Sequence, residues 1–186
     1  MNKNPNRCVY VNLRNPLYIR YHDEEWGIPE HSDQKLFEML LLECFQAGLS
    51  WECVLNKREA FRTAFDHFDA DKIACYGEEK IQQLMNNPAI IRNRLKIKAS
   101  IVNASVFKQI QAGYGSFDAY IWGYTNGKTI IEEYTVRTTS PLSDQISKDL
   151  KKRGMKFVGS TIIYSYLQAV GILNGHGKEC DWYKHD

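Results

Sequence analysis

The sequence predicts an all-α protein that folds as one domain over residues 1–186. Three observations support this prediction. Apolar residues recur at helical spacing along most of the chain. Glycines and prolines separate the helical stretches, and no repeat, low-complexity segment or linker divides them. A chain of 186 residues with 44% hydrophobic and 25% charged residues has the composition of a globular protein with a substantial core.

Composition narrows the functional classes. The net charge is only +2, so a surface for nucleic acid must come from local clustering of cations. The N-terminus lacks the apolar core of a signal peptide and no apolar run reaches spanning length, which predicts a cytoplasmic protein without membrane contact. The cysteines are Cys8, Cys44, Cys53, Cys75 and Cys180. This odd, scattered set argues against a disulfide framework and leaves metal binding open.

The N-terminal stretch, residues 8–27, gathers aromatic rings around a histidine. These residues are Tyr18, Tyr21, His22 and Trp26. The residue before a proline avoids helical angles, so Asn15-Pro16 should break any element there. The acidic run 23–25 favours a helix start or a charged surface turn. The alternative to a functional cluster is a packed N-terminal arm.

Residues 35–51 are the most apolar stretch, around which the chain is organised, and they begin with a predicted helix. Its expected boundary residues are Ser32 or Asp33 at the start and Gly48 at the end. A helix that is apolar nearly all round lies inside a protein, so Glu43 in its middle must be paired, neutralised or directed into a cavity. Together with Gln46 and Trp51, it can line a pocket for a flat, polar or cationic ligand. Alternatively, Glu43 pairs within a core that Trp51 merely fills.

Five further helices are predicted before Pro141, over residues 52–65, 69–75, 77–86, 90–110 and 117–122. The fourth and longest has two apolar stripes, Ile97, Ile101 and Ala104, then Val102, Val106 and Ile110. Its first part is basic, with Arg92, Arg94, Lys96 and Lys98, and is a second candidate surface for DNA. Residues 123–140 are the least helical, and a short hairpin around Asn126-Gly127 fits there.

Residues 143–171 are predicted to form a helix-hairpin-helix, in which two helices flank a glycine-containing bridge at 154–159. Glycines let a DNA backbone come close, and the free N–H groups at the start of the second helix bind phosphate. The residues expected to contact DNA here are Lys152, Lys156, Gly159, Ser160 and Thr161. The alternative is a plain corner between two helices with a solvated basic end.

His176 and Cys180 have a spacing at which one turn can supply two ligands to a metal ion. Cys8 and His22, near the other end of the chain, can supply the other two. Two cysteines and two histidines would make a closed tetrahedral zinc site, one ion per chain, without an open catalytic position. The spacing is not that of a zinc finger, so free thiols and solvent-exposed histidines remain the alternative.

Taken together, these segments resemble the bacterial 3-methyladenine DNA glycosylase I family, from Cys8 to Cys180. The motifs that carry the resemblance are PLYIRYHDEEWG at 16–27, LFEMLLLECFQAGLSW at 36–51, IIRNRLKIKASIVNA at 90–104, KKRGMKFVGSTIIYSYLQAVG at 151–171 and HGKEC at 176–180. Several long motifs in one order are far more specific than a single short pattern.

The resemblance implies a helix-hairpin-helix DNA glycosylase fold whose termini, 1–27 and 172–186, are tied by a structural zinc. The implied zinc ligands are Cys8, His22, His176 and Cys180. The implied base pocket consists of Glu43, Tyr21 and Trp51, with Tyr18, Trp26 and Tyr10 in its wall, and the family carries a tryptophan in place of Tyr10. The turn that would probe the gap left by a flipped nucleotide contains Gln46, Gly48 and Leu49. Other helix-hairpin-helix glycosylases carry a catalytic aspartate shortly after the second hairpin helix, which this family lacks; Asn174 lies near that place.

The resemblance also implies a monomeric enzyme that flips 3-methyladenine out of double-stranded alkylated DNA and hydrolyses its N-glycosidic bond, releasing the free base. The pocket motifs contain no lysine for a Schiff base, so a monofunctional enzyme without lyase activity is expected. One alternative is a damage-binding module that does not cut and would not need Glu43. Another is a zinc hydrolase, which a fully coordinated zinc disfavours because no position is left for water.

Overall fold

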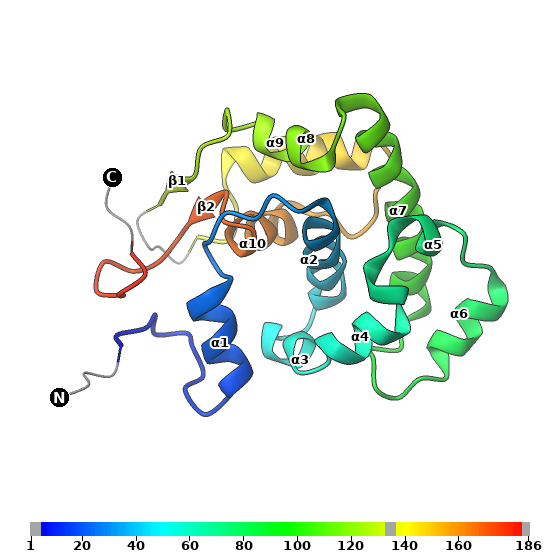
Figure 1. The fold of residues 1–186 in the computed structure, drawn as a ribbon, viewed down its shortest axis with the longest axis horizontal. Coiled ribbons are helices and arrows are strands. Elements are labelled where there is room, and N and C mark those ends of the chain that lie inside the picture. Colours follow the sequence, from blue (N-terminus) through cyan, green and yellow to red (C-terminus); the bar gives the residue numbers. More distant parts are fainter. Residues whose placement is uncertain (1–4, 133–136, 184–186) are drawn as a thin grey trace.

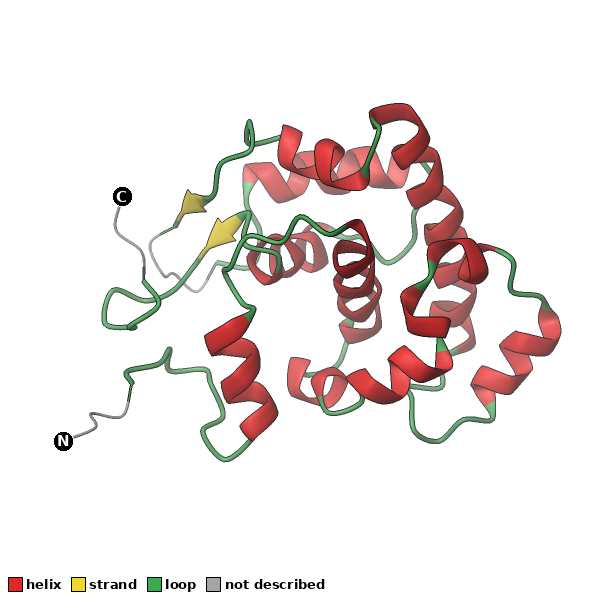
Figure 2. Ribbon diagram, viewed as in Figure 1, coloured by secondary structure: helices red, strands yellow, loops and turns green. Residues whose placement is uncertain are grey.

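The computed structural model describes residues 5–132 and 137–183. Its helices are α1 (Pro16–Glu24), α2 (Asp33–Gln46), α3 (Trp51–Leu55), α4 (Arg58–Ala64), the 3-10 helix η1 (Asp66–Phe68), α5 (Ala70–Ala74), α6 (Glu78–Met85), α7 (Arg94–Tyr114), α8 (Phe117–Gly123), α9 (Pro141–Lys152) and α10 (Ser160–Ala169). Two short strands, β1 (Ile130–Ile131) and β2 (Leu173–Asn174), pair in parallel. The mostly helical character predicted from sequence is confirmed (Figure 2). None of the described helices is long and apolar enough to cross a bilayer.

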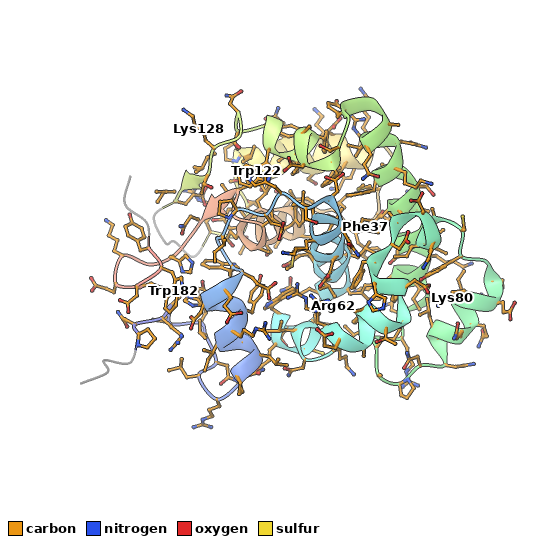
Figure 3. The ribbon with its side chains drawn as sticks, in the orientation of Figure 1. Phe37, Arg62, Lys80, Trp122, Lys128 and Trp182 are labelled. Carbon is orange, nitrogen blue, oxygen red and sulfur yellow. The ribbon has the colours of Figure 1, made fainter. Side chains whose placement is uncertain are left out.

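Helix α2 lies in the middle of the molecule, with α7, α8 and α10 around it (Figure 1). Every residue from 36 to 45 is buried, as the apolar run predicted. Phe37 lies toward α7, where its ring contacts that of Phe107 at a centroid distance of 4.6 Å (Figure 3). Burial of this many large apolar side chains supplies most of the driving force for folding.

The predicted end of the buried helix at Gly48 is confirmed, but Trp51, expected at the end of that helix, belongs to the next one. α2 ends at Gln46, and the chain turns at Gly48, whose φ of +80° is the left-handed conformation that glycine tolerates best. Trp51 therefore starts α3, which Ser50 caps by accepting from the Cys53 N–H. The glycine thus separates α2 from α3, as its position in the sequence indicated.

Asp33 does not cap its own helix as expected. Its carboxylate accepts from the N–H groups of Phe117 (2.9 Å) and Asp118 (2.7 Å), and from the Gln111 side chain (2.7 Å). A carboxylate at the start of a neighbouring helix satisfies that helix's unpaired donors and complements its dipole. Asp33 thus joins the start of α2 to the start of α8.

Helix α7 begins four residues later than predicted, at Arg94, with Asn93 as its cap. Of the second apolar stripe, Val106 and Ile110 are buried, whereas Val102 is 40% exposed. The prediction that Lys96 lies on a basic surface is wrong. Lys96 is buried and its Nζ donates to the carbonyls of Phe45 (2.7 Å) and Ala47 (2.6 Å), at the end of α2. A cation suits the negative end of a helix, and burial lowers the pKa of this amine.

We expect Lys96→Met to lower the free energy of unfolding by about 1–3 kcal/mol, because the carbonyls of Phe45 and Ala47 would no longer receive charge-assisted hydrogen bonds. Urea unfolding measures this change. Lys98→Met, at an exposed position of the same helix, is the matched control and should have little effect. Equal stability of both variants would mean that the buried charge costs as much as its hydrogen bonds contribute.

The predicted hairpin around Asn126-Gly127 is not formed, although both residues have the positive φ of a tight turn. Strand β1 instead pairs in parallel with β2, more than forty positions later in the chain. The Ile130 N–H donates to the Ile172 carbonyl (2.9 Å) and the Glu132 N–H to the Asn174 carbonyl (2.8 Å). This pairing places residue 132 beside the chain that leads to His176. The rest of the predicted non-helical stretch includes residues 133–136, which lie outside the described residues.

Helices α9 and α10 pack against each other and are joined by residues 153–159, as the sequence predicted. Ser140 caps α9 in a reciprocal pair with Ser143. The bridge turns at Gly154, whose φ is +105°. Asn103 of α7 fixes the bridge by bonding both backbone groups of Lys156, at 3.0 and 2.8 Å. The bridge is therefore held by the long helix as well as by its own flanking helices.

The described ends of the chain lie on one side of the molecule (Figure 1). The Asn6 N–H donates to the Asp181 carboxylate (2.9 Å) and the Asp181 N–H donates to the Asn6 carbonyl (2.9 Å). The predicted break at Asn15-Pro16 is where α1 begins, since Asn15 caps it and proline suits the first helical position. The acidic run 23–25 ends α1 instead of starting a helix.

Candidate functional site

A cavity of about 310 Å³ opens between α1, α2, α3 and α10. It is lined by Tyr10, Tyr18, Tyr21, His22, Trp26, Glu43, Gln46, Trp51, Glu132, Arg137, Thr138, Tyr164, Ser165, Gln168 and Gly175. All six residues predicted to form the base pocket are in this set, and so is Gln46. Its size and its mixture of rings with a few polar groups are typical of a small-molecule site.

Glu43 is the most unusual residue of this cavity. Its side chain is 2% exposed, and Oε2 has no hydrogen-bond partner among the described residues. Burial raises the pKa of Glu43 to about 8. Gln46 Oε1 and Trp51 Nε1 are also buried and lack a partner there. Native proteins leave few buried polar atoms unsatisfied, so three at one cavity indicate a site built for a ligand with complementary donors and acceptors.

Three different elements bring the rings around Glu43. Tyr21 comes from α1 and Trp51 from α3, and their ring centroids are 5.0 Å apart at a tilt of 46°. The turn at Gly48 redirects the chain so that Trp51 returns to the cavity that Glu43 lines. Tyr10 and Trp26 make a second ring pair, edge to face at 5.3 Å. The cavity therefore offers aromatic surfaces on which a flat ligand can stack.

Sequence reasoning missed part of the cavity wall. Tyr164 and Gln168 are one helical turn apart on α10, so helical spacing could have identified them as sharing a face. Glu132 and Arg137 belong to the stretch that was predicted only to be non-helical. The Tyr164 hydroxyl donates to Glu132 Oε2 at 2.6 Å. No local signal predicts this contact, because it depends on the parallel pairing of β1 with β2.

The predicted metal ligands Cys8, His22, His176 and Cys180 come together, with their ligand atoms within 4.8 Å of one another and all four side chains buried. His176 Nδ1 lies 3.5 Å from Cys8 Sγ and 3.4 Å from Cys180 Sγ, and His22 Nε2 lies 3.6 Å from Cys180 Sγ. Tetrahedral zinc with its usual bond lengths requires sulfur–nitrogen separations of about 3.5 Å. This buried group can therefore hold a metal ion.

Neighbouring groups orient the two histidines toward the cluster. His22 Nδ1 contacts Asp23 (2.8 Å), so its Nε2 faces the thiols, and Arg7 pairs with the same carboxylate. His176 Nε2 contacts the Trp26 carbonyl (3.1 Å), so its Nδ1 faces them. Such partners fix the imidazole ring and tautomer in metal sites. The guanidinium carbon of Arg7 lies 5.5 Å from the ring centroid of Trp182, a residue labelled in Figure 3.

The thiols differ in their environments. Burial alone would raise the pKa of Cys8, but hydrogen bonds from His176 and His22 outweigh it and lower the pKa to about 5. Burial raises the pKa of Cys180 to about 11. The thiolate is the form that binds metal, and the lowered pKa of Cys8 favours its thiolate form near neutral pH.

The turn containing Gln46, Gly48 and Leu49 lies close to the α9–α10 bridge. Lys96 connects them, because its Nζ bonds the end of α2 and lies 5.9 Å from the ring centroid of Phe157 in the bridge. Leu49 is 43% exposed. The predicted DNA contacts thus sit on neighbouring segments. Ser160 was expected to contact DNA, but its hydroxyl forms hydrogen bonds with the side chains of Ser143 and Asp144 in α9.

Comparisons with known proteins agree with this geometry. Residues 11–184 match a family model described as methyladenine glycosylase. The chain is 45% identical to DNA-3-methyladenine glycosylase 1 of Escherichia coli (strain K12) over 181 residues, covering 95% of this chain and 96% of that protein. A crystal structure of 3-methyladenine DNA glycosylase I, 45% identical, has a TM-score of 0.92 and covers 96% of this chain and 100% of that chain. A structure described as the basis of 3-methyladenine recognition by the Staphylococcus aureus enzyme, 37% identical, also has a TM-score of 0.92 and covers 97% and 98%. The chain belongs to the methyladenine glycosylase family.

Proposed function

We propose that this protein is a DNA repair glycosylase that excises 3-methyladenine from alkylated double-stranded DNA by hydrolysing the N-glycosidic bond. Its curated relatives are named for this activity, and one structural relative is described by its recognition of 3-methyladenine. Within this chain, the observation that carries the proposal is Glu43, a buried carboxyl without a protein partner in a cavity walled by aromatic rings.

Glu43 reads the edge of the base. A purine that enters the cavity stacks on Tyr21 and Trp51, and its exocyclic amino group donates to the Glu43 carboxylate. Methylation at N3 makes the base in DNA cationic, and a cation over an aromatic face gains about 0.5–2 kcal/mol. The positive charge also favours ionisation of Glu43, whose pKa burial has raised to about 8. An unmodified adenine brings no charge to offset that burial, so the cavity selects the alkylated base.

Cleavage of the glycosidic bond needs little catalytic help from the protein once the alkylated base has been selected. A cationic purine is a good leaving group, and its departure leaves an oxocarbenium-like sugar that water attacks, as in glycoside hydrolysis. No lysine is among the described residues that line the cavity, so no amine is placed to form a Schiff base. We therefore expect a monofunctional glycosylase. One chain supplies all the described lining residues, so a monomer suffices.

The cysteine–histidine cluster holds one structural zinc ion in this proposal. The separations of the ligand atoms and the orientation of both histidines support it. A bound zinc supplies a rigid four-point link and no catalytic position. Cys8 and His22 fix the N-terminal arm, which carries Tyr10 and leads into α1 with Tyr21. The cluster thus stabilises one wall of the base pocket.

The segment 143–171 acts as a helix-hairpin-helix in this proposal, with the bridge 154–159 on the DNA backbone. Lys152 and Lys156 are exposed at the end of α9 and in the bridge. The turn with Leu49 lies beside the bridge, where it can enter the space that a flipped nucleotide vacates. In this proposal, DNA lies across the bridge and the turn with Leu49.

Lys152→Ala with Lys156→Ala should weaken binding to duplex DNA. Each lysine–phosphate interaction that the substitutions remove should reduce the slope of log affinity against log salt by about one unit. Titrations at several salt concentrations measure the slope. Lys72→Ala, which removes the same charge from α5, is the control. An unchanged slope in the double variant would move the DNA surface elsewhere, with Arg92 and Lys98 as the next candidates.

Chromatography of small molecules released from methylated duplex DNA tests the proposed function. We expect free 3-methyladenine and an intact DNA strand at the resulting abasic site. Binding of damaged DNA without release of the base would indicate a damage-binding module instead. Strand cleavage by the enzyme at abasic sites would contradict the monofunctional mechanism.

A further inference from the structure

The cavity contains two acidic side chains among its described lining residues, and they lie at different depths. Glu43 is 2% exposed, whereas the side chains of Glu132 and Arg137 are 16% and 49% exposed. Glu43 is therefore the more deeply buried carboxylate, and Glu132 is the one nearer solvent. The proposed reading of the base by Glu43 gives no role to the second carboxylate.

Glu132 is held firmly in place. Its backbone N–H donates to the Asn174 carbonyl at 2.8 Å, which extends the parallel pairing of β1 with β2. Its Oε2 accepts from the Tyr164 hydroxyl at 2.6 Å. Arg137 Nη1 lies 3.7 Å from the other oxygen, Oε1, which leaves that oxygen at the edge of hydrogen-bond reach. A carboxylate fixed at its backbone and at one oxygen can present the other to a ligand without further ordering.

The position of the base determines what Glu132 faces. A purine whose amino edge reaches the more deeply buried Glu43 must keep its glycosidic nitrogen toward solvent, since the sugar remains attached to DNA. The sugar carbon C1′ would then lie on the solvent side of the base, toward the more exposed Glu132. Positive charge develops at C1′ as the glycosidic bond breaks.

We propose that Glu132 is the catalytic carboxylate that faces the sugar. This inference rests on the proposed glycosylase function. The C1′–N9 bond breaks and its electron pair leaves with the purine, which departs as neutral 3-methyladenine. Glu132 stabilises the positive charge on the sugar and orients a water molecule. The water oxygen bonds to C1′, and its proton passes to the Glu132 carboxylate and then to solvent.

The test is the single-turnover rate of excision from a duplex that carries 3-methyladenine. Glu132→Gln preserves the volume and a hydrogen bond to Tyr164 but removes the negative charge. We expect the rate to fall about tenfold to hundredfold. General base catalysis usually contributes about a hundredfold or more, and a smaller effect is expected here because the glycosidic bond of the alkylated base is itself labile. Affinity for free 3-methyladenine should change less than twofold, since the free base contacts the more deeply buried Glu43. Glu79→Gln, at an exposed position of α6, is the matched control.

A second variant separates chemistry from support of the fold. Glu132→Ala leaves space that formate can enter, so added formate should accelerate excision by Glu132→Ala but not by the parent or by Glu132→Gln. A merely structural carboxylate would show no such rescue. The inference is overturned if Glu132→Gln excises at the parental rate, or if its rate and its affinity for the free base fall in parallel. Failure of the parent protein to release any 3-methyladenine would instead overturn the proposed function.

Discussion

Replacing Glu43 by glutamine should lower the affinity for free 3-methyladenine about tenfold to hundredfold without unfolding the protein. The amide has nearly the same volume, and Glu43 Oε2 has no partner among the described residues, so the substitution breaks no observed contact of that atom. What it removes is a charge-assisted hydrogen bond from the base, worth about 1.5–3 kcal/mol. Calorimetric titration of the base into parent and variant measures the difference.

The same substitution should abolish a pH dependence. The pKa of Glu43 in the free protein, about 8, lies above its ordinary value of 4.5, so the folded protein retains a proton that the unfolded chain releases between these values. The free energy of unfolding should therefore fall as pH rises from about 5 to 8, by an amount on the order of a few kcal/mol. Glu43→Gln should lack this decrease and be relatively more stable than the parent at pH 9.

Affinity should change in the opposite sense over the same range. A base that requires the ionised carboxylate should bind the parent more tightly as pH rises toward 8, and Glu43→Gln should show no such trend. Trp51→Ala should weaken binding independently, because the base would lose a stacking surface. If Glu43→Gln unfolds the protein while binding per folded molecule is unchanged, Glu43 is a structural carboxyl and the base site lies elsewhere.

Loss of the metal site should have the second large effect. Cys180→Ser should abolish binding of one zinc ion per chain and lower the melting temperature, because the cluster joins residues near the two ends of the described chain. Structural zinc contributes about 10–16 kcal/mol of apparent binding energy in small zinc-finger peptides, where metal binding and folding are coupled. Here the α-helical core folds around α2, so a smaller and local loss is expected, centred on the N-terminal arm and residues 175–183.

Metal analysis and thermal unfolding measure these changes. Cys75→Ser, at an exposed cysteine outside the cluster, should keep both the zinc and the melting temperature of the parent. Chelation of the parent protein should reproduce the Cys180→Ser phenotype. Parent protein purified without chelator that contains no zinc would contradict the proposal. Cys180→Ser protein with unchanged metal content and stability would contradict it as well.

The sequence predicted the features that depend on local pattern or on strong chemical anomaly. The burial of helix α2 follows from its apolar run. Glu43 stands out in that run because a buried carboxyl must be paired, neutralised or directed into a cavity. The grouping of Cys8, His22, His176 and Cys180 was predicted from the spacing of His176 and Cys180, from the Cys8 and His22 pair near the other end of the chain, and from the family resemblance. The α9–α10 unit follows from its glycines and caps.

The features that the sequence did not predict depend on contacts between distant segments. Asp33 caps α8 instead of its own helix, and Lys96 binds the end of α2 instead of facing solvent. Glu132 reaches the cavity through parallel pairing with residues more than forty positions later, which no turn signal specifies. Trp51 lines the cavity with Glu43, but it starts α3 instead of standing at the end of the buried helix, because the chain turns at Gly48.

The central claim is that the cavity around Glu43 holds the base that the enzyme removes. The most direct test compares the release of 3-methyladenine from a methylated duplex by the parent, by Glu43→Gln and by the control Glu79→Gln. We predict release by the parent and by Glu79→Gln at the same rate, with slower release by folded Glu43→Gln. Release by Glu43→Gln at the parental rate, with parental affinity for the free base, would contradict the claim.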